Sequence, residues 1–100
     1  MTGYDAGLMQ FLTISRRRTE RFSDAEFATL ANDEAAAARA LYAGGFVRQI
    51  WHRADIGGAC MIFEAASEAE VREKIGTLPL ARADMLEVTI IPLKPYGGFR

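Results

Sequence analysis

The sequence predicts one α+β domain whose six elements follow the order βαββαβ, and three observations support this fold class. Four short segments rich in apolar and β-branched residues alternate with two segments that carry helix signals. The motifs SDAEF (residues 23–27) and SEAEV (residues 67–71) mark the same point in two successive βαβ halves. No linker or composition shift divides the 100 residues, so we expect a single domain over 1–100, with residues 1–7 as a flexible tail.

The first half supplies a strand and a long helix. Residues 8–15 (LMQFLTIS) are largely apolar and too few for a typical helix, so they predict a strand. Ser23 is placed as an N-cap, Glu26 completes a capping box, and Phe22 and Phe27 have the spacing of a hydrophobic staple. We expect a helix from this point to about Tyr42, where a glycine pair follows.

The second half supplies three strands and a short helix. Residues 46–53 and 59–65 predict strands, and the loop between them suits an antiparallel hairpin. Ser67 and Glu70 repeat the capping-box pattern, and Pro79 is expected to end the helix that they begin. Residues 86–93 predict the last strand, with Pro92 near its end, where a ladder hydrogen bond can be absent.

This order predicts a split βαβ, ferredoxin-like domain with a four-stranded antiparallel sheet and both helices on one face. The other face then meets either solvent or another subunit. On the last strand Leu86, Val88 and Ile90 form a uniformly apolar set, so we expect them to meet the helices. Glu87 and Thr89 are then expected on the open face.

Alternation along residues 46–53 sorts the side chains of the second strand into two sets. One set is Val47, Gln49, Trp51 and Arg53, and the other is Phe46, Arg48, Ile50 and His52. The pattern does not decide which set meets the helices.

Composition argues against several classes of partner and site. Lys plus Arg number 12 against 13 Asp plus Glu, so no net field draws the protein to nucleic acid or to an anionic membrane. Cys60 is the single cysteine, which excludes an intrachain disulfide and a multi-cysteine metal site. No apolar run is long enough to span a bilayer and residues 1–7 lack signal-peptide features, so we expect a cytoplasmic protein.

Several short segments between Ile50 and Pro95 occur together at an informative spacing. They are IW at 50–51, IFE at 62–64, S and AE within 67–70, LPL at 78–80, LEVT at 86–89 and PL at 92–93. Their joint spacing resembles that of the muconolactone isomerase family. The resemblance implies ferredoxin-like subunits that pair their open sheet faces as a dimeric α+β barrel. It also implies a homo-oligomer, either a dimer or a larger ring, with an interface pocket for a small-molecule ligand and no cofactor.

Two residues are candidates for proton transfer, which moving a double bond in a small lactone acid requires. Glu87 interrupts an apolar strand, and burial at an interface would suit its carboxylate to carrying a proton. It is otherwise a solvated or ion-paired strand carboxylate. His52 is the only histidine, and imidazole exchanges protons near neutral pH. Its neighbour Trp51 faces the opposite way, so if Trp51 lines the pocket, His52 lies in the helix-covered layer or at the strand end.

Other residues are candidates for substrate binding. Trp51 and Phe63 could form walls for a planar substrate, Arg53 could hold a carboxylate, and Thr89 shares the open face with Glu87. Tyr42 could donate a hydrogen bond into a pocket. Each also has an ordinary structural explanation as a packing or surface residue. A basic patch, expected to be a solvated loop or an anion site, precedes the first helix and comprises Arg16, Arg17, Arg18 and Arg21.

Three hypotheses for function remain open on this evidence. The leading one is a cofactor-independent, isomerase-like enzyme acting on a small unsaturated lactone or related acid. The second is a non-catalytic ligand-binding or assembly subunit, which the absence of ionisable side chains from residues 10–15 favours. The third is a cofactor-free monooxygenase of the dimeric α+β barrel type.

Overall fold

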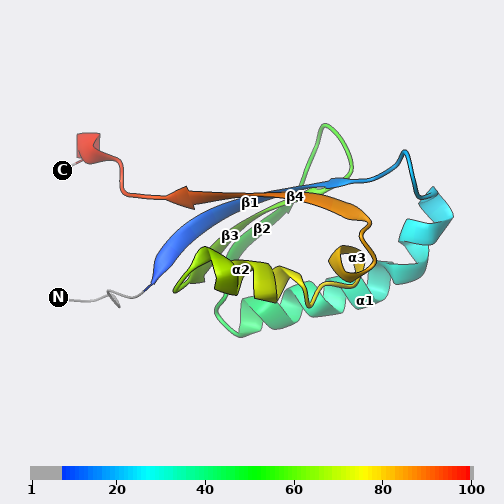
Figure 1. Cartoon of the computed structure of the whole chain (residues 1–100), viewed down its shortest axis with the longest axis horizontal. Helices are drawn as coiled ribbons and strands as arrows, with labels where there is room; N and C mark the ends of the chain where they lie inside the picture. Colours follow the sequence, from blue (N-terminus) through cyan, green and yellow to red (C-terminus); the bar gives the residue numbers. More distant parts are fainter. Residues whose placement is uncertain (1–7, 100) are drawn as a thin grey trace.

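The computed structural model describes residues 8–99, and the predicted tail at 1–7 lies outside the described residues. Four strands, three helices and a C-terminal 3-10 turn follow one another along the chain (Figure 1). Their bounds are Met9–Arg17 (β1), Asp24–Ala43 (α1), Val47–His52 (β2), Ala59–Ala65 (β3), Glu68–Ile75 (α2), Pro79–Arg82 (α3), Leu86–Leu93 (β4) and Gly97–Phe99.

The strands form one sheet in the order β2-β3-β1-β4, and every neighbouring pair is antiparallel. The two strands that begin the βαβ halves, β1 and β3, therefore lie in the centre, and β2 and β4 form the edges. This arrangement confirms the predicted βαββαβ fold with a four-stranded antiparallel sheet.

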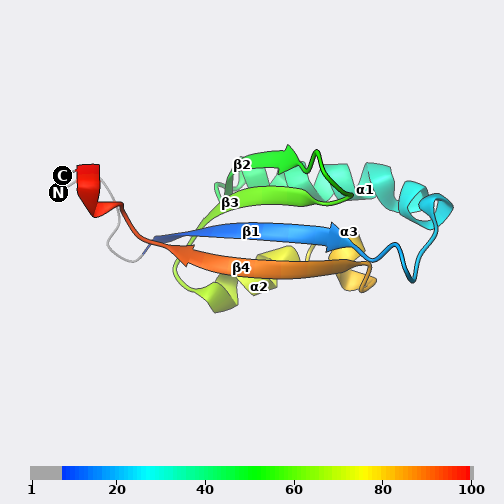
Figure 2. The ribbon, with the colours of Figure 1, turned by 90° about the horizontal axis from the view of Figure 1, so that it is seen from above.

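The helices lie on one side of the sheet (Figure 1), and Figure 2 looks onto the face that the helices leave open. The core lies between the two layers, where Phe11, Val47, Phe63 and Val71 are almost completely buried. As predicted, the half-buried side chains of β4 pack toward the helices, and Glu87 and Thr89 are exposed on the open face.

Local hydrogen bonds explain where the two longer helices begin. The Ser23 hydroxyl accepts the Glu26 N–H at 3.2 Å, and the Glu26 carboxylate accepts the Ser23 N–H at 2.8 Å, which confirms the first capping box. At α2 the Ser67 hydroxyl accepts the Glu70 N–H, as predicted. The Glu70 carboxylate, however, accepts from Ala66 rather than from Ser67, so the second box is only half formed.

The short helix α3 was not predicted, because Pro79 was expected only to end the preceding helix. Proline is well tolerated at the first position of a helix, where its missing N–H would have no partner, and Pro79 starts α3 in this way. After α3, Asp84 adopts a φ of 60° and turns the chain into β4. Ion pairs to Arg18 and Arg21 hold Asp84 in place.

A β-bulge changes the predicted facing of β2. Val47 pairs with Phe63, but Gln49 already pairs with Ile62, so two steps on β2 match one step on β3. The extra residue is Arg48. Beyond the bulge, Gln49 still groups with Trp51 and Ile50 with His52, as predicted. Val47 is the exception, because the bulge places it on the helix side with Ile50 and His52.

Candidate functional site

A cavity of about 600 Å³ lies between α1 and the helix-facing side of the sheet. This volume is within the usual range for small-molecule sites. Its walls come from β1, α1, β2, the β2–β3 turn, β3, α2, the α2–α3 segment, α3 and β4. The lining residues are Thr13, Ser15, Arg17, Phe27, Ala31, Glu34, Ala35, Ala38, Arg39, Tyr42, Ile50, His52, Gly58, Ala59, Met61, Ile75, Leu78, Leu80, Leu86 and Val88.

The side chains of α1 explain why this space is not filled. Phe27 and Leu41 are the buried residues of α1, and they pack near its two ends. Between them, α1 lines the cavity with the small residues Ala31, Ala35 and Ala38 and with the side chains of Glu34 and Arg39. An alanine methyl group cannot reach the sheet, so the helix is held at its ends above a hollow.

Glu34 is the one carboxylate among the lining residues. One of its oxygens accepts the backbone N–H of Leu80 at 2.9 Å, which caps α3 from a neighbouring helix. The other oxygen makes no hydrogen bond within the described part of the chain. Burial raises the pKa of Glu34 above its ordinary value, although the Leu80 N–H and the Arg17 charge oppose this effect.

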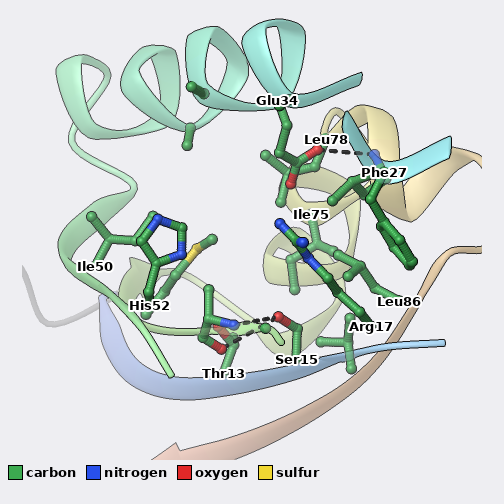
Figure 3. Close-up of a pocket in the computed structure, with 18 of the residues that line it drawn as sticks. Thr13, Ser15, Arg17, Phe27, Glu34, Ile50, His52, Ile75, Leu78 and Leu86 are labelled. Atoms are coloured by element: carbon green, nitrogen blue, oxygen red, sulfur yellow. Dashed lines mark hydrogen bonds between the residues drawn. The ribbon is translucent and has the colours of Figure 1, made fainter. Parts of the chain in front are cut away.

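Arg17 extends from the end of β1 into the cavity. Its guanidinium carbon lies 5.0 Å from the centre of the Phe27 ring, a cation–π distance. Figure 3 shows the Arg17 and Glu34 side chains pointing toward one another across the cavity. The mostly apolar wall of the cavity therefore carries one carboxylate, of Glu34, and two guanidinium groups, of Arg17 and Arg39.

Two hydroxyl groups of β1 form part of the sheet side of the cavity. The Ser15 hydroxyl donates to the Ala59 carbonyl at 3.3 Å and accepts the Ala59 N–H at 3.0 Å, so both of its functions are used (Figure 3). Thr13 is only 4% exposed. Its hydroxyl makes no hydrogen bond to any residue that the structure describes.

Two of the predicted site residues line this cavity. His52 projects from the edge strand β2 beside Ile50, at the end opposite Arg17 (Figure 3). Tyr42 lines the cavity from the last turn of α1 and is otherwise largely exposed. Trp51 and His52 face opposite sides of the sheet, as predicted, but it is His52 and not Trp51 that lines this cavity.

Three predicted residues lie on the open face instead, because β2 and β4 turn them away from the helices. Trp51 stands opposite Cys60, and Thr89 stands opposite Ile14. Glu87 forms an ion pair with Arg16 at 3.1 Å, and its side chain is 59% exposed. These residues do not line the cavity, and a site built on them needs a second subunit above the open face.

The remaining two predicted residues occupy structural positions. Phe63 is fully buried in the core. Arg53 lies just beyond β2, where its guanidinium pairs with Asp55 at 2.8 Å and also donates to the Ser15 carbonyl. Hydrogen bonds to Arg53 and Ile56 lower the pKa of Asp55 to about 2. This pair shapes the β2–β3 turn.

Sequence reasoning did not single out Glu34 or Thr13, and it treated Arg17 only as part of a basic patch. A signal for Glu34 was present. Phe27, Ala31, Glu34, Ala38 and Leu41 follow helical i, i+3/i+4 spacing, so Glu34 is the one charged residue on the inward stripe of α1. No comparable signal marks Thr13, since a threonine in a strand is common.

Within residues 8–99, no group of three or more His, Cys, Asp or Glu side chains could hold a metal ion. None of the helices described is long and apolar enough to cross a membrane.

Comparison with known proteins places these observations in a family. A solved structure of similar fold is 5-chloro-2-hydroxyhydroquinone dehydrochlorinase from Burkholderia phenoliruptrix, in complex with 2,5-dihydroxybenzoquinone. The match has a TM-score of 0.72 at 19% identity and covers 90% of this chain and 98% of that chain, which shows the shared fold. No relative was found among curated protein sequences. The sequence profile of muconolactone delta-isomerase matches residues 9–98, and the chain therefore belongs to the muconolactone delta-isomerase family.

Proposed function

We propose that this protein is a cofactor-independent, isomerase-like enzyme that moves a proton and a double bond in a small unsaturated lactone or related acid. The observation that carries the proposal is the half-buried Glu34 carboxylate, which reaches into a mostly apolar cavity large enough for one small ring compound. Family membership supports the reaction class. The bound benzoquinone of the dehydrochlorinase supports a ligand of similar size on this fold.

Glu34 has the properties that a proton carrier needs. Its free oxygen can take a proton from a carbon next to a carbonyl group, the double bond shifts, and the same proton returns to another carbon of the substrate. The raised pKa of Glu34 makes its carboxylate a better base than an ordinary exposed glutamate. The reaction is an isomerisation, so its atoms and electrons balance without an oxidant or reductant. His52, at the other end of the cavity, is the second candidate for carrying the proton.

Glu34→Gln is the variant that tests this role. Glutamine keeps an oxygen that can accept the Leu80 N–H, so we expect the free energy of unfolding to stay within about 1 kcal/mol of the wild-type value. Glutamine cannot carry a proton, so kcat for muconolactone should fall about a hundredfold or more. Spectrophotometric turnover and urea denaturation measure the two quantities.

Glu87→Gln is the matched control, because it makes the same chemical change on the open face. Our proposal predicts that it leaves kcat within a few-fold of wild type. A large loss in Glu87→Gln with normal turnover in Glu34→Gln would move the reaction to the open face, as the sequence alone predicted. Trp51 and Thr89 would then belong to that site.

We also propose that the protein is a homo-oligomer that pairs its open sheet faces. An apolar band crosses this face and is flanked by the polar pairs Arg16 with Glu87 and Gln10 with Glu64. The band comprises Leu12, Ile14, Trp51, Cys60, Ile62 and Ile91. An apolar surface with a polar border is typical of a subunit interface.

A second candidate function is a non-catalytic ligand-binding subunit. The observation that favours it is the hydrogen bond from Leu80, which gives Glu34 a structural task without any chemistry. This alternative predicts ligand binding with no turnover of muconolactone and no proton exchange with solvent. Oxygen consumption with quinol-like compounds would instead indicate the monooxygenase alternative.

A further inference from the structure

The Thr13 hydroxyl belongs to a buried residue that lines the cavity, and it has no hydrogen-bond partner among the described residues. Thr13 is 4% exposed, and no hydrogen bond joins its hydroxyl to another residue in the described ranges. This hydroxyl is not one of the enclosed polar atoms without a partner, a status that only Arg18 Nε has within residues 8–99, so a molecule in the cavity can reach it. Ser15, two residues along the same strand face, has two hydrogen bonds. The difference marks Thr13 as the β1 hydroxyl that is available to a ligand.

Arg17 is distinguished from its neighbours in a similar way. Arg16 and Arg18, on either side of it, both pair with carboxylates. Arg17 pairs with none among the described residues, and its guanidinium lies over the Phe27 ring inside the cavity. Stacking on a ring holds a guanidinium in a fixed plane while its N–H groups stay free for a planar anion.

The strand geometry sets the separation between these two groups. Thr13 and Arg17 face the same side of β1 and are four residues apart, which places their Cα atoms roughly 13 Å apart. The long Arg17 side chain extends into the cavity, so its guanidinium and the Thr13 hydroxyl line the same space (Figure 3).

We propose that Thr13 and Arg17 form a two-point recognition strip for a ring acid, in which Arg17 binds the carboxylate and the Thr13 hydroxyl donates to an oxygen at the other end of the ring. This proposal rests on the proposed function only in using the same cavity. It defines the substrate class as a small monoanion with an oxygen substituent or ring oxygen opposite its carboxylate. Glu34, facing Arg17 across the cavity, then lies beside the ring carbons between the two anchors.

Three probes separate the two contacts in a calorimetric titration of the full chain: para-hydroxybenzoate, its neutral amide, and benzoate. We expect wild type to bind the acid about tenfold more tightly than the amide, because a hydrogen bond to a charged group contributes more than a neutral one. Arg17→Met should remove this preference. Arg82→Met is the matched control, since Arg82 does not line the cavity, and it should keep the preference.

Thr13→Val tests the second contact with an isosteric side chain. It should remove about a fivefold preference for para-hydroxybenzoate over benzoate. Because the hydroxyl has no partner in the unliganded protein, Thr13→Val should leave stability unchanged or raise it. Ser15→Ala, which loses two hydrogen bonds, should lower stability and serves as the contrast.

The recognition strip would be refuted by any of three results. Wild type could bind the acid and the amide equally, Arg17→Met could keep the acid preference, or no probe could bind at millimolar concentration. A stability loss in Thr13→Val as large as that in Ser15→Ala would remove Thr13 from the recognition strip. Muconolactone turnover without any acid preference would support the proposed reaction and refute the recognition strip. An acid preference without turnover would support the recognition strip and refute the proposed reaction.

Discussion

At the scale of single residues, Gly58 joins the sheet to the wall of the cavity. Its φ of 147° is a conformation that other residues rarely adopt, and a Cβ there would overlap the Ser15 carbonyl oxygen. Gly58→Ala should therefore destabilise the protein by about 2 to 3 kcal/mol in urea denaturation.

Gly45 provides the comparison for this substitution. Its φ is also positive, at 84°, but a Cβ there would meet no atom within 4 Å. Gly45→Ala should cost only about 1 kcal/mol, from backbone conformation alone. Equal losses in the two variants would show that the close approach to Ser15 contributes nothing.

Glu34 gives a prediction for the dependence of stability on pH. Its pKa in the folded state is raised above the ordinary value of 4.5 that it has in the unfolded chain. At a pH between the unfolded-state and the folded-state pKa, the folded protein therefore binds more protons than the unfolded one. This contribution to stability is present at low pH and is lost as pH rises through the window. The free energy of unfolding of wild type, minus that of Glu34→Gln, should therefore decrease from pH 4 upward.

Subtracting the free energy of unfolding of Glu34→Gln from that of wild type isolates the contribution of Glu34. Groups whose pKa is lowered in the folded state contribute equally to both proteins and cancel. Hydrogen bonds from Arg16 lower the pKa of Glu20 to about 2, so the stability from Glu20 is lost as pH falls below its ordinary range. This change is common to wild type and variant. A flat difference between wild type and Glu34→Gln across this pH range would contradict the burial argument.

Residue chemistry was only partly predictable from the sequence. His52 and Tyr42 were identified and line the cavity, whereas Glu34 lay hidden in an alanine-rich helix. The facing of Glu87 and Thr89 was predicted correctly, because strict alternation on β4 determines it. The sequence could not show how deeply each side chain is buried. Whether a hydroxyl such as Thr13 has a partner depends on contacts between distant segments.

At the scale of elements, α1 is a helix anchored at two ends. Ala38 lies in the hollow between the anchors and is half-buried, so a larger side chain there would fill the cavity. Ala38→Leu should abolish binding of para-hydroxybenzoate while leaving the fold intact, because it adds apolar contacts in empty space. Calorimetric titration and circular dichroism measure the two effects.

Ala36→Leu makes the same change on the exposed side of α1, away from the cavity. It should bind the probe as wild type does. Normal binding by Ala38→Leu would mean that the ligand does not enter this space.

The elements themselves were well predicted where local signals are strong. Capping residues and alternation located α1, α2 and the four strands to within a few residues. The helix α3 was missed because Pro79 was interpreted only as the end of α2, and because the carboxylate that accepts the Leu80 N–H belongs to Glu34, 46 positions before Leu80. A cap supplied from so far away leaves no local pattern.

At the scale of the whole molecule, the two faces of the sheet have different tasks. The helix-covered face holds the cavity, and the open face carries the apolar band in which Trp51 is 49% and Ile91 is 39% exposed. We expect sedimentation velocity to show a dimer or larger assembly at micromolar concentration. Ile91→Lys should convert it to monomers, because a lysine charge would be buried at the interface.

Ala36→Lys adds the same charge on the outer side of α1 and should leave the assembly unchanged. The Trp51 fluorescence maximum offers a second measurement, since it should shift to longer wavelength when Ile91→Lys exposes the band. A wild-type protein that sediments as a monomer would refute the pairing of open faces and with it any site that contains Glu87 and a partner subunit.

The bulge at Arg48 has a consequence for how this family can tolerate insertions and deletions. Loss of Arg48 would leave a regular strand in which Val47, Ile50 and His52 still face the helices. Loss of one residue between Arg48 and His52 could likewise be absorbed by straightening the bulge, whereas a second loss would exchange the inward and outward side chains. The strand thus carries one extra residue, so this edge can lose one residue, but not two, before the side chains that face the cavity and the open face change places.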